Sequence, residues 1–212
     1  ISTRDTTVDE ALRFNGATGA LLIRHDPGLD WYFSSFLNAA PASSFGFHIE
    51  GTRAIEPSDR ETCLIDYGGT DGLCKLVIKD DGKVKFTMNE VSITTDNAQF
   101  TSHADEYTFK IFCGRQKNAA DRQALFIRSE VPGNTSYPIE EKTTQSTNYT
   151  PFLDLNLIPN IYIGTEASAN SVKRYKGSLT KLAMYPSYYT ADAGQSLSEF
   201  SFDLTTQAMV DG

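Results

Sequence analysis

The stretch from residue 62 to residue 89 constrains the fold of this 212-residue chain most strongly. It holds three short runs in which apolar and polar residues alternate, separated by glycine-containing turns. A period of two places successive side chains on opposite faces of a β-strand. Antiparallel sheets with one face on a core show this pattern. The stretch therefore predicts three half-buried antiparallel strands, whose core faces carry Cys63, Ile65, Tyr67, Cys74, Leu76, Ile78, Val84, Phe86 and Met88.

The turn Asp80-Asp81-Gly82 fixes the register of two of these strands. A three-residue hairpin loop takes glycine at the position that needs a positive φ, and Gly82 stands there. This loop pairs Ile78 with Val84, so that core residues face core residues. A two-residue loop would instead oppose Ile78 to Lys85, which excludes that register.

The preceding turn leaves the state of two cysteines open. If Gly68-Gly69 forms the loop, Cys63 lies directly across from Cys74, and a cross-strand disulfide becomes conceivable, although its geometry is demanding. The alternative is two small buried thiols. With Cys113 the number of cysteines is odd, which is a poor disulfide framework, and no CxxC pair indicates a zinc or redox site.

Runs of β-type residues continue along the chain, whereas helix signals are scarce. Many short strands between turn signals are typical of a sandwich or barrel. Polar loops are expected over 117–122 and 130–148, and the second is long enough to be functional or mobile. No repeat or boundary divides residues 1–212, so one domain is expected, with a core over about 11–204 and terminal arms outside it. The expected strands are 20–24, 45–50, 62–67, 73–79, 83–89, 107–113, 123–128, 160–164, 180–185 and 198–204.

The charge of the chain limits its partners. The formal net charge is −8, which argues against nucleic acid or an anionic membrane surface, since both call for a basic patch. No apolar run approaches the roughly 20 residues of a membrane span, so membrane insertion is not expected.

Several segments resemble one superfamily when they are taken in order. Residues 11–16, 19–23 and 26–29 resemble the LxFxG strand, second strand and dPxL turn that open laminin-G-like domains. Residues 44–49 and 62–86 resemble the next strand and the central hairpins, and residues 161–164 with 175–185 resemble the closing segment. Two departures are His48, where tryptophan is usual, and 129–134, which replaces a DG hairpin.

This resemblance to the concanavalin-A-like, laminin-G-like superfamily implies an all-β, two-sheet antiparallel jelly-roll sandwich. It also implies a module that binds glycans or proteins, often with calcium at one rim. The positions that match its calcium ligands are Asp71 and Asp105, with Glu106 beside the second, and Asp66 on an outward strand face is another candidate. The alternative is that these are ordinary turn aspartates. Calcium takes oxygen ligands of this kind from several loops.

Ligand binding is expected to use aromatic and amide side chains on loops, because sugars stack on flat aromatic faces and hydrogen-bond to amides. One cluster is Trp31 and Tyr32, for which core packing is the alternative. The other follows the long polar loop and its end, with Asn134, Tyr137, Asn148 and Tyr149. Asn134 and Asn148 also open glycosylation triplets, which matter only in a protein secreted by a eukaryote.

Catalytic signals are absent from the sequence. Polysaccharide hydrolases of the superfamily carry alternating acidic residues on one strand, whereas Glu56 and Asp59 are three apart and Pro57 argues against a central strand. No HExxH or GxSxG motif occurs. His25 and His103 are expected at the surface, and His48 at a rim or facing outward. We therefore expect no enzyme.

These observations lead to three hypotheses for the function of the chain. The first is a non-catalytic module that recognises glycan or protein at a loop rim, with calcium as an expected aid. The alternative is a structural assembly subunit, such as a virion decoration, spike or filament protein, whose terminal arms clasp neighbouring copies. A polysaccharide-degrading enzyme is the third. An extracellular, cell-surface or virion-surface location is expected for each.

Overall fold

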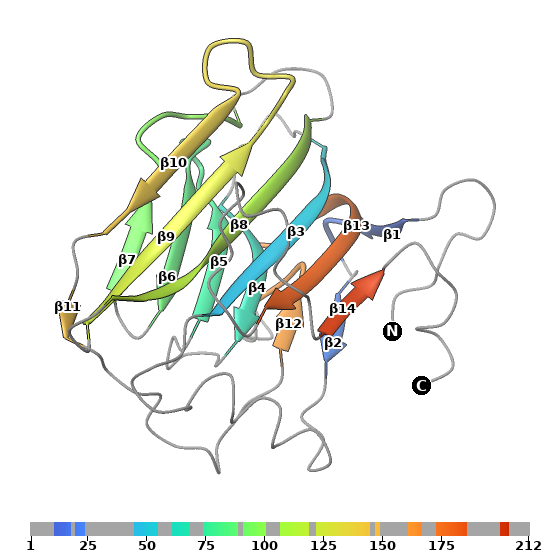
Figure 1. The fold of residues 1–212 in the computed structure, drawn as a ribbon. Coiled ribbons are helices and arrows are strands. Elements are labelled where there is room, and N and C mark those ends of the chain that lie inside the picture. Colours follow the sequence, from blue (N-terminus) through green and yellow to red (C-terminus); the bar gives the residue numbers. More distant parts are fainter. Residues whose placement is uncertain are drawn as a thin grey trace.

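The computed structural model describes residues 11–17, 20–23, 45–54, 61–67, 74–88, 91–100, 107–118, 122–144, 147–148, 161–166, 173–185 and 200–203. They form two antiparallel sheets that pack face to face (Figure 1). Among these residues no helix is long and apolar enough to cross a membrane.

The larger sheet has eight strands in the order β1-β13-β3-β8-β9-β10, with β11 beside β9 and β14 beside β13. The smaller sheet has the order β2-β12-β4-β5-β6-β7. In both sheets a late strand, β12 or β13, lies between two early ones. The larger sheet comprises β1 (Leu12–Asn15), β3 (Phe45–Arg53), β8 (Tyr107–Asn118), β9 (Arg122–Glu130), β10 (Ile139–Thr143), β11 (Thr147–Asn148), β13 (Lys176–Tyr185) and β14 (Phe200–Asp203). The smaller comprises β2 (Leu21–Ile23), β4 (Thr62–Tyr67), β5 (Cys74–Ile78), β6 (Val84–Met88), β7 (Val91–Thr94) and β12 (Ile161–Ile163).

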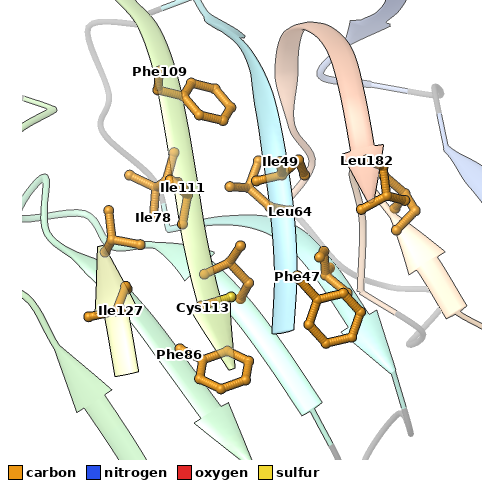
Figure 2. Packing of buried hydrophobic residues seen from close by; sticks show 14 of the residues in the cluster. Phe47, Ile49, Leu64, Ile78, Phe86, Phe109, Ile111, Cys113, Ile127 and Leu182 are labelled. Atoms are coloured by element: carbon orange, nitrogen blue, oxygen red, sulfur yellow. The ribbon is translucent and has the colours of Figure 1, made fainter. Parts of the chain in front are cut away.

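The core lies between the inner faces of the two sheets (Figure 2). Alternate residues of β3 and β8 point into it, among them Ile49 and Ile111, which are fully buried. Leu76 and Phe86 face them from the smaller sheet and are equally buried. Removal of this apolar surface from water is the main favourable term in folding, so the period-two pattern in the sequence decides which face of each strand lies inside.

The hairpin between β5 and β6 confirms the predicted register. Ile78 pairs with Val84, and Leu76 pairs with Phe86. Gly82 has a φ of 79°, and its backbone N–H donates to the carbonyl of Lys79 at 3.0 Å. The glycine therefore supplies the left-handed residue that a three-residue loop needs.

Cys63 does not pair with Cys74, as it would if Gly68-Gly69 formed the loop. The chain between β4 and β5 spans residues 68–73, so that Tyr67 pairs with Cys74 and Cys63 pairs with Val77. The register also shifts between Cys63 and Ile65, which is a β-bulge. A bulge admits one extra residue on one strand, so Leu64 and Ile65 both join the core cluster whereas Cys63 does not. All three cysteines are free and buried.

The predicted polar loop over 130–148 contains two strands, β10 and β11, which pair with β9. The sequence Ile139–Thr143 alternates between exposed and half-buried positions, with no side chain fully inside. Its strand conformation comes from the ladder to β9 rather than from an apolar face, and therefore leaves no hydrophobic period in the sequence. Strand β7 was likewise not predicted.

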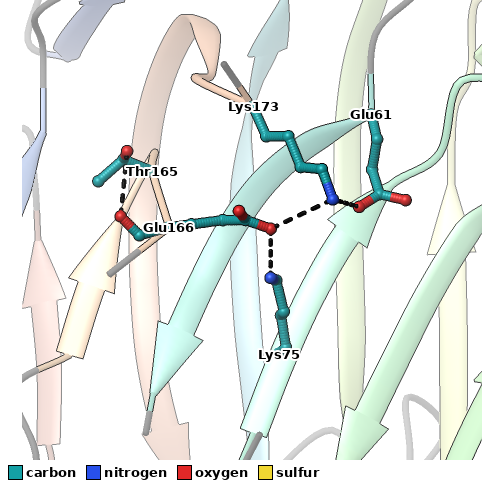
Figure 3. A network of polar contacts seen from close by, with 5 residues as sticks. All are labelled: Glu61, Lys75, Thr165, Glu166 and Lys173. Atoms are coloured by element: carbon teal, nitrogen blue, oxygen red, sulfur yellow. Dashed lines mark hydrogen bonds and ion pairs between the residues drawn. The ribbon is translucent and has the colours of Figure 1, made fainter. Parts of the chain in front are cut away.

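A network of ion pairs fastens the chain after β12 to the smaller sheet (Figure 3). Lys173 Nζ lies 2.6 Å from Glu61 and 3.4 Å from Glu166, and Lys75 of β5 also binds Glu166. Partial burial acts to raise the pKa of Glu166, but the hydrogen bond and charge of Lys75, with Lys173, lower it. The backbone N–H of Cys63 donates to the carbonyl of Lys173 at 3.1 Å, so the same connection covers the bulge in β4.

Candidate binding rim

Three turns are joined into one surface at one end of the sandwich. They are the β5–β6 turn (80–82), the segment after β7 (95–100) and the β9–β10 loop (131–138), and together they are called the rim here. The carbonyl of Gly82 accepts hydrogen bonds from the backbone N–H groups of Gln99 and Phe100, both at 3.0 Å. The β9–β10 loop projects at the top of Figure 1.

Asn134 ties the β9–β10 loop to the segment after β7. Its side-chain Nδ2 donates to the carbonyl of Gln99 at 2.9 Å and to that of Ala98 at 3.3 Å. Its Oδ1 accepts from the backbone N–H of Ser136 at 3.0 Å and of Tyr137 at 2.9 Å. Only 8% of Asn134 is exposed. The sequence predicted that Asn134 presents its amide to a ligand. In the structure the amide is bonded within the protein and holds the loop in shape.

Gln99 fixes the same loop from beneath. Its side chain is fully buried, and Nε2 donates to the carbonyls of Ser129 and Tyr137, both at 3.0 Å. Both backbone polar groups of Tyr137 are thus bonded to side chains. Loops on a rigid scaffold are where binding residues concentrate. The backbone of this loop is fixed by hydrogen bonds from two buried side chains.

The rim and the first residue of β10, which follows it, expose two large apolar side chains. Tyr137 is 42% exposed and Ile139 is 52% exposed, whereas Leu22, the other one among the described residues, lies on the smaller sheet. An aromatic ring held on a fixed backbone offers a flat apolar face and a polar hydroxyl with little entropy left to lose. Such a surface can stack on a sugar ring or pack against a protein.

Charged side chains lie on the strands that follow and precede this loop, and Glu130 pairs directly with Ile139. Arg128 Nε lies 2.8 Å from Glu130, and its Nη1 lies 2.5 Å from Glu141. Partial burial acts to lower the pKa of Arg128, but the hydrogen bonds and charges of both carboxylates raise it. Across the gap between the sheets, Asn97 Nδ2 donates to Glu140 at 2.8 Å and Lys142 binds Asp96.

The β5–β6 turn continues this charge pattern. Lys79 Nζ lies 2.8 Å from Asp81. Partial burial acts to raise the pKa of Asp81, but the hydrogen bond from Lys79, with the charges of Lys79 and Lys83, lowers it. Asp80 accepts a hydrogen bond from the backbone N–H of Asp81 at 2.9 Å, so both aspartates are held in the turn.

The structure unites only part of the predicted site. Asn148 lies in β11 and pairs with Arg122 at the far end of β9 from the rim. Eight residues of strand separate the two ends, which is roughly 26 Å. Asn148 therefore does not join Asn134 and Tyr137. Trp31, Tyr32, Tyr149, Asp71, Asp105, His25 and His103 lie outside the described residues.

His48 faces away from the core, as predicted, but it is buried, with 4% exposed. Its ring stacks on Phe112 with centroids 4.0 Å apart, and its Nε2 lies 2.8 Å from Glu50 Oε1. Burial, with the charges of Lys181 and Lys110, lowers the pKa of His48 to about 3. His48 is therefore neutral at physiological pH and lies apart from the rim.

No metal centre is formed within the part of the chain that the structure describes. No group of three or more His, Cys, Asp or Glu side chains there could hold an ion. Asp71, Asp105 and Glu106 fall outside that part, so calcium binding there stays a prediction. Asp66, expected to face outward, is instead buried, with 2% exposed.

One residue of the rim, Gln99, and one directly beside it, Ile139, were not predicted from the sequence. Ile139 stands in a polar stretch, and its exposure follows from its place on the outward face of the edge strand β10. Gln99 has no local signal, because its side-chain partners lie 30 and 38 residues away. The Pro138-Ile139 pair directly after Tyr137 is the one local sign of an apolar surface.

The fold is similar to that of solved glycan-binding and laminin domains. The CBM40 module of a Ruminococcus gnavus IT-sialidase, bound to α2,6-sialyllactose, matches with a TM-score of 0.54 and 12% identity over 86% of this chain and 93% of that one. The LG1–3 region of the laminin α2 chain matches with a TM-score of 0.53 and 17% identity over 90% and 33%. A Trypanosoma rangeli sialidase matches with a TM-score of 0.53 and 13% identity over 88% and 27%.

The chain therefore has the concanavalin-A-like, laminin-G-like jelly-roll fold that its sequence predicts. No protein-family model matches the chain. No curated protein sequence matches it either.

Proposed function

We propose that this chain is a non-catalytic binding module that recognises a glycan through the rim, with Tyr137 as the central contact. The observation that carries the proposal is the exposure of Tyr137 on a loop whose backbone is fixed by Asn134 and Gln99. The likeness to a carbohydrate-binding module over most of both chains supports a glycan as the ligand.

The rim suits this role because its aromatic side chain can be removed without removing its support. The bonds to Asn134 and Gln99 use the backbone N–H and carbonyl of Tyr137, not its ring. Tyr137→Ala therefore keeps the loop and deletes the stacking surface. Leu22→Ala removes a side chain of similar exposure, 37%, from the other sheet and serves as the matched control.

A glycan array, followed by titration calorimetry on the strongest hit, tests the proposal. Tyr137→Ala is expected to weaken binding by about tenfold, the effect of removing an interfacial aromatic anchor. Leu22→Ala is expected to bind as the unmodified chain does. Equal binding by Tyr137→Ala would place the ligand elsewhere and overturn the rim as the site.

A blank array would overturn the glycan as ligand. The structural assembly subunit would then become the leading function, because Tyr137 and Ile139 also suit a contact between protein surfaces. Equilibrium sedimentation at high concentration tests that alternative. A monomer at every concentration would contradict it.

Calcium assistance at Asp71 and Asp105 is part of the proposal as an expectation from the resemblance. A ligand that binds only the folded state raises the melting midpoint by mass action. A melt with calcium and then with a chelator, repeated on Asp71→Ala, is the test. An unchanged midpoint would remove calcium from the proposal and leave the rim as it stands.

A further inference from the structure

We infer that the rim selects uncharged glycans and disfavours glycans that carry a carboxylate. This inference rests on the proposed function at Tyr137 and specifies the class of ligand. The inference concerns the same surface as the proposed function. Its evidence is the charged groups of that surface, whereas the evidence for the proposed function is the exposed side chain of Tyr137.

Among the residues that the structure describes, negative charge is in excess at the rim and on the strands that flank it. Each of these groups lies in one of the three turns or within four residues of one along a strand, and each is at least partly exposed. The carboxylates are Asp80, Asp81, Asp96, Glu130, Glu140 and Glu141. The cations are Lys79, Lys83, Arg128 and Lys142.

Each of these cations already faces a carboxylate. Arg128 lies between Glu130 and Glu141 and contacts both. Lys142 binds Asp96. A sugar carboxylate that approached Tyr137 would have to displace one of these contacts to gain a partner.

The β5–β6 turn is arranged in the same way. Lys79 binds Asp81, and the charge of Lys83 also acts on that carboxylate. Asp80 stays next to them with its own negative charge and is exposed. No cation of this turn is therefore left to attract an acidic sugar.

Lys110 is the nearest further cation on the outer face of the larger sheet. It is exposed, but strand register places it directly between Glu50 and Glu130. It lies on β8, two strands from Ile139, which is roughly 10 Å. Glu130 therefore lies next to both Arg128 and Lys110. With Glu50 and Lys110 counted, seven carboxylates still face five cations in the described part of this surface.

The physical consequence is a modest, salt-dependent repulsion of anionic ligands. Exposed charges close to one another change an equilibrium by up to about fivefold. At physiological ionic strength they act over about 8 Å and are screened beyond that distance. A neutral glycan that stacks on Tyr137 meets none of this repulsion, and its hydroxyl groups can donate to carboxylate oxygens.

This ligand class differs from that of the similar CBM40 module. The ligand in that structure is α2,6-sialyllactose, whose sialic acid is anionic. The shared fold therefore does not imply a shared ligand, since specificity lies in the residues of the site.

The experiment uses an array of neutral glycans paired with their sialylated and uronate-bearing forms, with lactose and sialyllactose as one such pair. Neutral members are expected to bind about fivefold more tightly than their acidic partners at low salt. The ratio is expected to approach one as salt is raised. Glu141→Gln and Glu130→Gln, which release Arg128, are expected to lower the ratio, whereas Thr135→Ala, an uncharged change in the same loop, is expected to leave it.

The outcomes separate this inference from the proposed function. If acidic glycans bind more tightly and Tyr137→Ala abolishes their binding, the rim is a glycan site but the selection for neutral ligands is overturned. A preference for neutral glycans that the two glutamate variants and salt leave unchanged would also overturn it, because charge would not be its cause. If no glycan binds, or if Tyr137→Ala binds normally, the proposed function fails and this inference fails with it.

Discussion

The backbone N–H of Tyr137 donates a 2.9 Å hydrogen bond to Oδ1 of Asn134. The exposed aromatic side chain of the rim is thus held by a neighbour that is itself buried and bonded to a different turn. Support for the site and contact with a ligand belong to different residues. The two roles can therefore be separated by substitution.

Asn134→Ala should destabilise the fold. It removes two acceptor and two donor contacts that satisfy partly buried backbone groups, so we expect a loss of about 2 kcal/mol in the free energy of unfolding. Urea denaturation measures it. Thr135→Ala, at an exposed neighbour, should change stability by less than about 0.5 kcal/mol. Equal stability of Asn134→Ala and the unmodified chain would contradict the structural role.

The same burial bears on the glycosylation triplet at Asn134. The side-chain nitrogen that would carry a glycan donates two hydrogen bonds in the folded chain. Expression in a eukaryotic secretory host should therefore leave Asn134 of the folded protein unmodified, which peptide mass mapping can establish. A glycan at Asn134 on natively folded protein would show that the loop forms with at most one of these bonds, because the linked nitrogen keeps a single N–H.

His48 should make stability fall at mildly acidic pH. Burial, with Lys181 and Lys110, lowers its pKa in the folded state to about 3, whereas an unfolded histidine titrates near 6.5. The unfolded chain therefore binds the extra proton first as pH falls below that value. The stabilisation is complete above pH 6.5 and declines toward pH 3.

Between pH 7 and pH 5 the unmodified chain should lose about 2 kcal/mol more unfolding free energy than His48→Gln. Chemical denaturation at both values gives the comparison, and the variant corrects for every other titrating group. Nuclear magnetic resonance of the imidazole offers a direct check. A pKa above 6.5 would mean that Glu50, 2.8 Å from Nε2, outweighs burial.

Gly82→Ala should be strongly destabilising. The residue has a positive φ, and an added Cβ would lie 2.3 Å from the carbonyl oxygen of Phe100. This oxygen belongs to the backbone and cannot move away by a side-chain rotation. The left-handed conformation alone costs roughly 1–2 kcal/mol, so a loss of at least about 2 kcal/mol is expected. Thermal unfolding measures it. Gly46→Ala, whose Cβ would meet only ordinary contacts at 3.4 Å, is the control and should be near neutral.

The parts of the fold that the sequence predicts are those in which a local pattern and a tertiary requirement coincide. Ile78 and Val84 alternate with lysines and flank a glycine turn, so burial and turn chemistry select one register. Around Cys63 the local pattern fails. The bulge that carries Leu64 into the core interrupts the alternation within β4 itself, so a strict period of two does not reveal it.

The candidate site shows the same division. Tyr137 could be predicted, because an aromatic residue stands out in a polar loop segment of the sequence. Gln99 and Asp96 could not, since the contacts that join them to the β9–β10 loop and to β10 cross from one sheet to the other. Residues that support a site from a distant part of the chain follow no fixed sequence spacing, so the sequence alone does not identify them.

The three thiols should be unreactive in the native state and free on unfolding. All three cysteines are buried and free. Burial is the main cause that raises the pKa of each thiol, with nearby Asp66 adding to it at Cys63 and Cys113 adding to it at Cys74. Because the thiolate is the reactive form, a thiol-specific reagent at neutral pH should label the native chain slowly and should count three thiols after denaturation without reductant.

A count of one would restore the disulfide between Cys63 and Cys74 and refute the register of β4 and β5. Fast labelling of Cys63 alone, mapped by mass spectrometry, would instead show that the connection fastened by Glu61, Lys173 and Glu166 opens in solution.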